Sequence, residues 1–287
     1  MAAVGEAPAW FRRAVSERPG HRELEFGTTR LHYRTWGDPS LPGLVLVHGA
    51  GANSSWWDHL APLITTHHVI APDLSGHGDS DHRTSYDLRS WAGEISAITA
   101  AEGLDRPIIA GHSLGGWVAV TLASETREAV SGLVLIDSPL RRDASAEQSL
   151  PHQRRRLHRV YPSTDQAIER FRTLPHQQAV LPYVRRHIAA ESLAAVDGGW
   201  TWKFDPFVVG RQPPLPDAFT RLTCRTALFY CERGLVNREM AAEMQRLVRG
   251  PFRTAELPDA GHHPMLDQPL VLVTALTTLL QMWLPPW

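Results

Sequence analysis

Short runs of apolar residues alternate along this chain with longer segments of helical periodicity, and this alternation constrains the fold more than any other feature. The apolar runs fall at residues 31–36, 44–47, 68–72, 107–110, 133–136, 226–230 and 252–257. Apolar residues recur at helical spacing at residues 86–104, 114–126, 238–248 and 270–283. Strands that are apolar throughout must be buried on both faces, and helices between successive strands supply that cover. We therefore predict an α/β fold with a mostly parallel central sheet flanked by helices.

Residues 139–222 interrupt this alternation. The section is rich in Arg, His, Pro and Gln and lacks a clear buried strand. We expect it to form short helices separated by prolines, at residues 147–160, 164–173 and 181–196. Because buried strands resume after residue 222, we interpret the section as an insertion between two strands of the sheet.

The charged residues of this 287-residue chain nearly cancel, which argues against two classes of function. Lys and Arg together number 29, and Asp and Glu number 30, for a formal net charge of -1. No basic field favours a nucleic-acid partner, and no acidic field favours a cation-binding surface. Lys203 is the only lysine, and we interpret the preference for arginine as a bias of codon usage.

The cysteines and the N-terminal residues indicate a reducing compartment. Cys224 and Cys231 fall in or beside one predicted strand, roughly 23 Å apart along it, which is too far for a disulfide. Residues 1–18 lack an apolar core of signal-peptide length. The longest apolar segment, residues 270–284, contains three threonines and a glutamine, so we interpret it as a buried terminal helix rather than a membrane span. We expect a cytoplasmic protein with free thiols.

The strongest chemical signal is the pattern G-x-S-x-G, which occurs as Gly-His-Ser-Leu-Gly at residues 111–115. It follows a predicted strand and opens a predicted helix. The two glycines permit a sharp turn that would project the Ser113 hydroxyl from the carboxyl edge of the sheet. We therefore predict that Ser113 is a nucleophile.

A serine nucleophile needs a base, because its hydroxyl is weakly reactive near neutral pH. His262 follows the last predicted strand and a glycine, and from there its ring can reach across the sheet edge. We interpret its neighbour His263, the rival, as a loop histidine exposed to water. Asp137 and Glu232 each follow a predicted strand, and either could orient the base. Asp259 is too close to His262 along the chain, and we interpret it as a turn residue.

We expect neither a metal nor a cofactor. The chain has 15 histidines, but none stands in the H-E-x-x-H pattern or a comparable ligand spacing. The chain also lacks a G-x-G-x-x-G segment after a predicted strand and a P-loop, so no nucleotide cofactor is implied.

Four motifs in sequence make the chain resemble the α/β-hydrolase fold family over nearly its whole length. They are His-Gly-Ala-Gly at 48–51, Asp-Leu-Ser-Gly-His-Gly-Asp-Ser at 73–80, the Ser113 turn, and Gly-His at 261–262. The resemblance implies an oxyanion hole formed by the backbone N–H groups of Ala50 and Leu114, each worth on the order of 3 kcal/mol. A serine at the turn, where the family's haloalkane dehalogenases and epoxide hydrolases need a carboxylate, argues against those activities.

One departure from the family concerns the acid. Most members place an aspartate just after the penultimate strand, in a pattern like G-E-x-D, but this chain has Cys-Glu-Arg-Gly at 231–234. Gly234 therefore stands where the aspartate would be. Some members carry the acid after the strand that follows the nucleophile helix, and there this chain has Asp137, 24 residues after Ser113. The resemblance thus favours Asp137 over Glu232.

The resemblance also implies that the insertion is a helical cap. The predicted domains are then a core of residues 1–138 and 223–287 and a cap, or lid, of residues 139–222. Candidate substrate-pocket residues are Trp200 and Trp202 of the cap with Trp57 and His112 of the core. We interpret the arginines at 154–156, with Arg159, as a solvated helix face.

The resulting hypothesis is a carboxylesterase-like serine hydrolase acting on a small-molecule ester. Ser113 attacks the carbonyl, His262 takes the proton, Asp137 orients His262, and water releases the acyl group. Hydrolysis of a lactone, thioester or carbon–carbon bond, or perhydrolysis, would use the same triad and remains open. The alternative from another class is a low-turnover ligand-binding receptor on the same fold. We expect no nucleic-acid partner and no membrane span, and the oligomeric state stays open.

Overall fold

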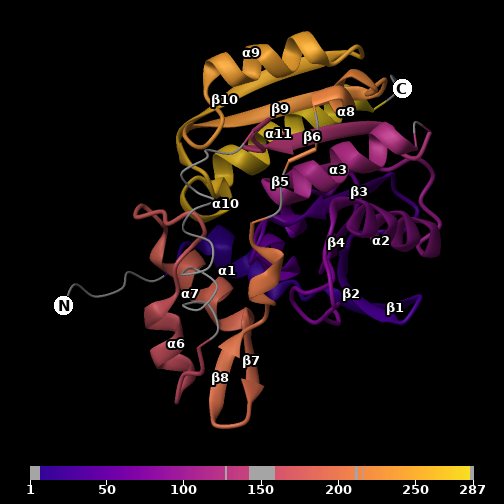
Figure 1. Cartoon of the computed structure of the whole chain (residues 1–287). Coiled ribbons are helices and arrows are strands. Elements are labelled where there is room, and N and C mark those ends of the chain that lie inside the picture. Colours follow the sequence, from indigo (N-terminus) through magenta and orange to yellow (C-terminus); the bar gives the residue numbers. More distant parts are fainter. Residues whose placement is uncertain (1–6, 127, 142–158, 211–212, 215, 285–287) are drawn as a thin grey trace.

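In the computed structural model, which describes residues 7–126, 128–141, 159–210, 213–214 and 216–284, eight strands form one central sheet (Figure 1). They are Gly20–Phe26 (β1), Thr29–Trp36 (β2), Gly43–Val47 (β3), His68–Pro72 (β4), Ile108–His112 (β5), Gly132–Ile136 (β6), Arg225–Arg233 (β9) and Phe252–Gly261 (β10). Their order across the sheet is β1-β2-β4-β3-β5-β6-β9-β10. β1 pairs antiparallel with β2, and β2 with β4, whereas the pairs from β4–β3 to β9–β10 are parallel.

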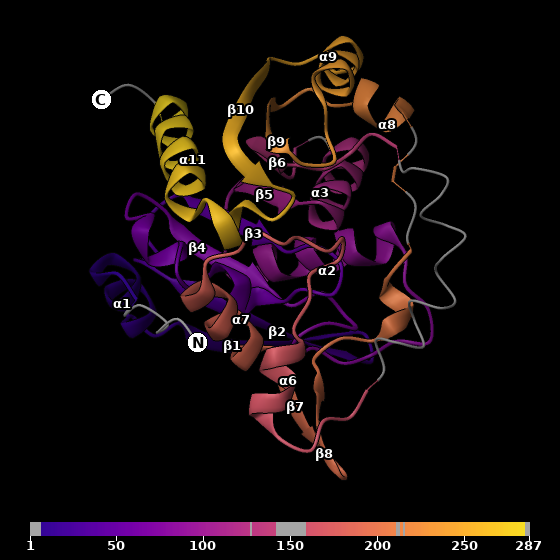
Figure 2. The same ribbon diagram turned by 90° about the vertical axis from the view of Figure 1, so that its left-hand side faces the viewer.

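Apolar side chains alternate between the two faces of this sheet, and helices cover both faces (Figure 2). Leu44 and Leu46 of β3 belong to one cluster, together with residues of α1 (Ala9–Ser16) and α11 (Pro269–Trp283). The intervening Val45 and Val47 belong to a second cluster, together with residues of α2, α3, α8 and α9. Those helices span Leu88–Ala101 (α2), Leu114–Glu125 (α3), Pro216–Thr220 (α8) and Arg238–Leu247 (α9). The period of two is that of a strand buried on both faces, and the predicted α/β fold is confirmed.

Two N-terminal details differ from the prediction. β1 is an edge strand that is mostly exposed and carries no apolar run, so the sequence does not predict it. The helix predicted over 86–104 begins at Leu88 instead. The Asp87 side chain accepts a hydrogen bond from the Ser90 N–H at 2.9 Å and so caps the first turn.

Four short elements from the chain between β6 and β9 lie together at one end of the molecule (Figure 1). They are Thr164–Arg170 (α6), Pro182–Glu191 (α7), Leu193–Val196 (β7) and Gly199–Trp202 (β8). The helix predicted over 181–196 was wrong beyond Glu191, because β7 and β8 form an antiparallel hairpin. Gly198, with a φ of 84°, permits its tight turn. The helix expected at 147–160 lies outside the described residues up to residue 158. The arginines at 154–156 lie outside them as well.

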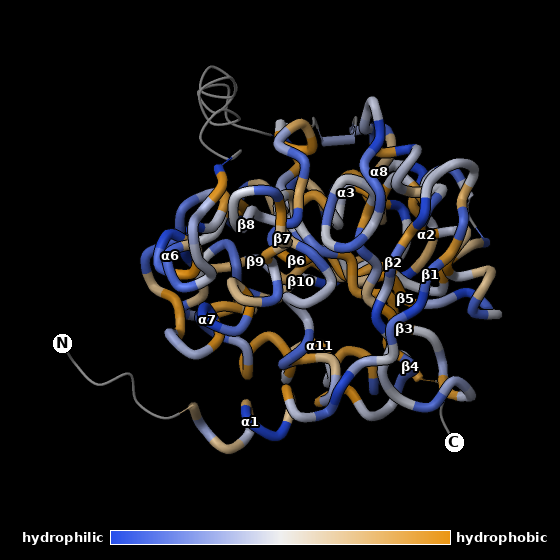
Figure 3. Tube along the Cα trace, turned by 90° about the horizontal axis from the view of Figure 1, so that it is seen from below, coloured by the Kyte–Doolittle hydropathy of each residue, from blue (hydrophilic) through white to orange (hydrophobic). Residues whose placement is uncertain are grey.

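Hydrophobic residues concentrate around the central strands, as the colouring of the trace shows in Figure 3. The terminal segment expected to be a buried helix is α11, which packs on the sheet through Leu272, Leu276 and Leu280. Among the described helices, none is both long enough and apolar enough to cross a membrane. Cys224 and Cys231 are free thiols.

Candidate active site

Ser113 occupies the turn between β5 and α3, at the carboxyl edge of the sheet. Its backbone has φ 51° and ψ -114°, a conformation that residues with a side chain rarely adopt. The turn is tightly packed, because a Cβ atom on Gly115 would lie 2.3 Å from the Val47 carbonyl oxygen. A Cβ atom on Gly111 would meet the backbone of Gly115 at the same distance. Both glycines of the pattern are therefore required for the turn that presents the serine.

His262 and Asp137 meet at this edge of the sheet. The Nδ1 atom of His262 lies 2.7 Å from Oδ2 of Asp137, and both side chains are buried. The Asp137 carboxylate also accepts hydrogen bonds from the N–H groups of Cys231, Leu235 and Val236, at 3.2, 2.7 and 3.3 Å. A carboxylate partner places the ring proton of His262 on Nδ1, so Nε2 is left as the basic nitrogen.

Gly234 explains how Asp137 can occupy this place. A Cβ atom on Gly234 would lie 2.4 Å from each carboxylate oxygen of Asp137. The carboxylate from the end of β6 thus fills the space that a side chain at position 234 would need. A side chain at position 234, after β9, and the Asp137 side chain, after β6, therefore reach the same point from neighbouring strands.

The structure separates the other candidates from this pair. Glu232 is exposed, and its Oε2 accepts a hydrogen bond from the Asp259 N–H at 2.8 Å rather than facing His262. The expectation that His263 is exposed to water was wrong: it is 3% exposed, and its Nε2 lies 3.3 Å from the Pro175 carbonyl oxygen.

No hydrogen bond joins the side chains of Ser113 and His262 in the described chain. Within the described chain, Nε2 of His262 is buried and has no hydrogen-bond partner. His112, the residue before the serine, packs on His262 with ring centroids 4.8 Å apart, and its Nε2 lies 2.8 Å from the His262 carbonyl oxygen. Catalytic hydrogen bonds commonly tighten only when substrate is bound.

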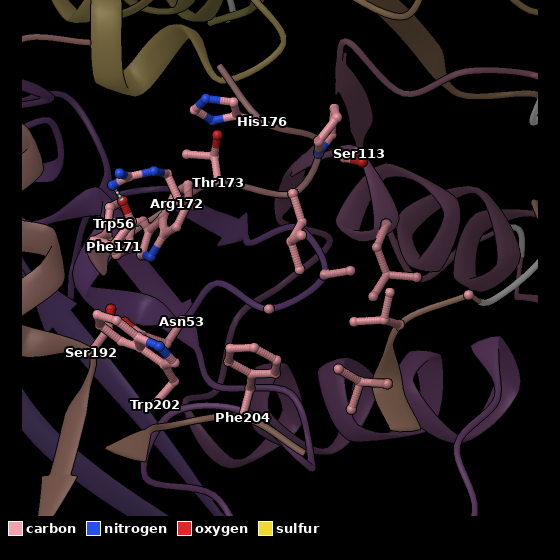
Figure 4. Close-up of a pocket in the computed structure, with 18 of the residues that line it drawn as sticks. Asn53, Trp56, Ser113, Phe171, Arg172, Thr173, His176, Ser192, Trp202 and Phe204 are labelled. Carbon is pink, nitrogen blue, oxygen red and sulfur yellow. Dashed lines mark hydrogen bonds between the residues drawn. The ribbon is translucent and has the colours of Figure 1, made fainter. Parts of the chain in front are cut away.

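Ser113 lies at one side of a pocket of about 1140 Å³ (Figure 4). Ala50 and Leu114, the candidate oxyanion donors, also line it. The facing walls carry aromatic side chains from the core and from the segment between β6 and β9: Trp56, Phe171, Trp202 and Phe204. An aromatic cavity beside a strained serine suits a small organic substrate.

Three of the four candidate pocket residues do not line this pocket. Trp57 is 1% exposed within the core, and its neighbour Trp56 faces the pocket instead. They belong to the 3₁₀ helix Ser54–Trp57, in which adjacent side chains point about 120° apart, so one tryptophan faces the core and the other the pocket. His112 is buried behind Ser113, and Trp200 packs against the apolar core. Trp202 does line the pocket.

The pocket is also cationic. Five of its described lining residues carry a positive side chain: Arg141, Arg159, Arg170, Arg172 and Lys203. Among the described lining residues there is no aspartate or glutamate. Residues outside the lining compensate two of these charges, since Arg141 pairs with Glu243 and Lys203 with Asp79, at 2.5 and 2.8 Å. Sequence reasoning missed this clustering, because the five residues are spread over 63 positions and come together only on folding.

The motif at 73–80 joins the segment between β6 and β9 to the core. Asp73 is buried and accepts hydrogen bonds from the Ser54 and Asp79 N–H groups at 2.6 and 2.9 Å, which fixes the loop. The Gly78 N–H then donates to the Lys203 carbonyl oxygen at 2.7 Å. The motif therefore positions the aromatic wall next to Ser113.

A family model and several known proteins are similar to this chain. A model described as "Alpha/beta hydrolase family" matches residues 44–276. The esterase Rv0045c of Mycobacterium tuberculosis is 28% identical over 252 residues, which cover 83% of this chain and 82% of that protein. Epoxide hydrolase 3 of Xenopus tropicalis is 25% identical over 286 residues, which cover 92% of this chain and 78% of that protein.

Other matches are shorter in extent or structural in kind. An uncharacterized protein of Mycobacterium tuberculosis, Rv2715, is 38% identical over 99 residues, and this match spans 29% of that protein's length and 34% of this chain. The solved structure of E-2-(acetamidomethylene)succinate hydrolase superposes with a TM-score of 0.78 at 23% identity, over 92% of this chain and 100% of that one. At this identity the likeness concerns the fold alone.

Proposed function

This chain belongs to the alpha/beta hydrolase family, and from that premise we propose that it is a serine hydrolase that cleaves a carboxylic ester through an acyl-enzyme on Ser113. The observation that carries the proposal is the buried contact of 2.7 Å between His262 Nδ1 and Asp137 Oδ2, at the sheet edge that also presents Ser113. A binding protein needs no base held in one tautomer beside a strained serine.

The proposed reaction has two halves. Nε2 of His262 takes the Ser113 proton as the hydroxyl oxygen attacks the ester carbonyl, and the alcohol leaves with that proton. Water then attacks the acyl-enzyme, again losing its proton to His262, and the acid leaves with Ser113 restored. Asp137 holds the ring and stabilises the imidazolium that forms in each half. The N–H groups of Ala50 and Leu114 would bind the oxyanion, since both residues line the pocket and Leu114 N–H opens a helix.

We also propose that residues 139–222 act as a cap over the site. Phe171, Trp202 and Phe204 of this segment line the same pocket as Ser113 and Ala50. The hydrogen bond from Gly78 to Lys203 and the contact of Lys203 with Asp79 would hold the cap on the core.

Within this reaction class, the cationic lining favours an ester that carries a negative group away from the bond that breaks. Arginine recognises carboxylates and phosphates through paired N–H donors. No aspartate or glutamate among the described lining residues opposes such a group. An aromatic or acyl part would pack on Trp56, Phe171 and Trp202. Lactones and thioesters with a similar charge are the nearest alternatives, because their carbonyl carbon is attacked in the same way.

Labelling with a fluorophosphonate probe tests the nucleophile, because the probe reacts only with an activated serine. We expect a covalent adduct on Ser113 in the intact protein and none in Ser113→Ala, whose circular dichroism spectrum should match the parent. A panel of p-nitrophenyl esters, lactones and thioesters, neutral and carboxylated, then identifies the bond. Absence of any adduct at Ser113 in the folded protein would favour a low-turnover ligand-binding receptor.

A further inference from the structure

Three imidazoles form a cluster behind the wall of the pocket. The ring centroids of His112, His262 and His263 lie 4.6–5.1 Å apart, and all three side chains are buried. One ring nitrogen from each lies within 4.8 Å of one from each of the others. The proposed reaction uses only His262 as a base, so it does not explain why three rings gather here.

In each ring, one nitrogen faces a hydrogen-bond acceptor. Nε2 of His112 lies 2.8 Å from the His262 carbonyl oxygen, Nδ1 of His262 lies 2.7 Å from Asp137 Oδ2, and Nε2 of His263 lies 3.3 Å from the Pro175 carbonyl oxygen. Carbonyl and carboxylate oxygens only accept hydrogen bonds, so these nitrogens carry the ring protons. Metal-binding histidines are oriented by this same kind of outer contact.

The second nitrogen of each ring is therefore a lone-pair donor without a partner. These atoms are His112 Nδ1, His262 Nε2 and His263 Nδ1, and each is buried with no hydrogen bond in the described chain. Leaving a buried polar atom unpaired is unfavourable by about 1–3 kcal/mol. The three rings that carry these atoms form one cluster, and a ligand that accepts lone pairs would satisfy them.

We propose that His112, His262 and His263 form a binding site for a divalent transition-metal ion, with Zn²⁺ as the representative, and that an ion bound there inhibits the hydrolase. Three imidazole nitrogens with no oxygen ligand favour Zn²⁺, Co²⁺, Ni²⁺ or Cu²⁺ over Mg²⁺ and Ca²⁺. The inhibition rests on the proposed function, because the ion would hold the lone pair of His262 Nε2 that must take the Ser113 proton. The binding itself does not depend on it.

The cluster adjoins the pocket. Ser113, next to His112, and Pro175, the hydrogen-bond partner of His263, both line the pocket. The sequence has no ligands at short spacing, which is why it predicts no metal. His112 lies 150 residues before His262 and 151 before His263, and only the fold brings them together.

Direct binding is measured first, on the full chain without a histidine tag and after treatment with a chelator. Titration calorimetry at pH 7.5 should show one Zn²⁺ per chain with a Kd in the micromolar range or below, and no heat from Mg²⁺. Added Co²⁺ should give the visible absorption bands of nitrogen-ligated cobalt. In His263→Phe, which keeps a ring of similar size, Zn²⁺ should bind at least tenfold more weakly. His176→Ala, which removes an exposed histidine of the same pocket, should bind as the parent does.

The activity of each variant, normalised to its own metal-free rate, is measured second. Zn²⁺ should inhibit the parent reversibly, with EDTA restoring the rate, and should inhibit His263→Phe only at tenfold higher concentration. If the phenylalanine variant does not fold, His263→Gln makes the same comparison. If the protein binds Zn²⁺ but hydrolyses no ester, the proposed function is wrong and the proposed metal site stands. Hydrolysis without Zn²⁺ binding, or equal binding by parent and His263 variant, would overturn the site.

Discussion

Asp137 has a backbone φ of 44°, which a residue with a side chain adopts only where its surroundings require it. Three backbone N–H groups and His262 all contact its carboxylate, and the bare Cα of Gly234 leaves the room. The strain is thus held by many fixed contacts at one side chain. Asp137 and His262 are therefore positioned by the backbone as much as by each other.

Replacing Asp137 with Asn should lower kcat/KM about 10³–10⁴-fold while the protein stays folded, because the amide no longer holds the ring in the required tautomer. Steady-state rates with the best p-nitrophenyl ester measure the effect. Glu232→Gln is the matched control and should keep the parent rate, since Glu232 faces the Asp259 N–H. The reverse pattern would assign the acid to Glu232.

The shared space at Gly234 permits a relocation of the acid. Asp137→Gly alone should be nearly inactive, and adding Gly234→Asp should raise the rate at least tenfold over that single variant. The reason is that a side chain at 234 is built toward the place of the lost carboxylate. Gly234→Asp alone should lower the free energy of unfolding by about 3 kcal/mol or more, since it buries a second carboxylate against the first. Urea denaturation and ester hydrolysis check both; no gain in the double variant would contradict the shared position.

At the scale of elements, the pocket is a joint product of the sheet edge and the segment between β6 and β9. The turns after β3 and β5 supply Ala50 and Ser113, whereas the chain around α6 and β8 supplies Phe171 and Trp202. The link from Gly78 to Lys203 joins the two walls. Under the proposed function, chemistry and substrate choice belong to different elements, so a change in the second wall should alter KM more than kcat.

Arg170→Gln tests the charge of that second wall. For a carboxylated ester, KM should rise about two- to fivefold with kcat little changed, the size expected of an exposed charge. For the neutral ester of the same acyl group, both constants should stay the same. Arg89→Gln, on the far helix α2 and paired with Glu125, is the control and should change neither. Equal effects on the charged and neutral esters would contradict an anionic substrate.

For the whole molecule, many buried histidines stay neutral in the folded state. Burial lowers the pKa of His59 and of His67 to about 4. The same cause lowers the pKa of four further histidines, which are His48, His77, His112 and His263. The unfolded chain binds these protons first, at about pH 6.5. Stability from the neutral rings is thus complete above pH 6.5 and is lost as pH falls toward 4.

The free energy of unfolding should therefore decrease between pH 7.5 and pH 5. Each such histidine contributes at most about 1.4 kcal/mol for each pH unit below 6.5. The carboxyls Glu94 and Asp267, whose pKa burial raises, act in the opposite direction. Urea denaturation at both pH values measures the net effect. His59→Gln should flatten the dependence. A flat profile for the parent would contradict this account.

Local patterns in the sequence determined most of the strands and helices and two of the candidate catalytic residues, Ser113 and His262. An apolar run predicts a buried strand wherever it lies, and two glycines around Ser113 predict the turn because only neighbouring atoms are involved. These features depend on contacts within about ten residues, so the order of strands and helices and the family could be predicted. β1 was missed because it carries no apolar run, and β7 was missed because its four residues, Leu-Ala-Ala-Val, continue the segment predicted as a helix over 181–196.

Only the tertiary structure decided what depends on distant segments. Asp137 rather than Glu232 meets His262, because β6 lies beside β9, and one N–H group of β9 with two from the residues after it donates to the Asp137 carboxylate. Trp56 rather than Trp57 faces the pocket, and His263 is buried against His112, 151 positions earlier. Separation along the sequence does not give distance in the folded chain. The packing at the sheet edge therefore decides which of the candidate side chains meet.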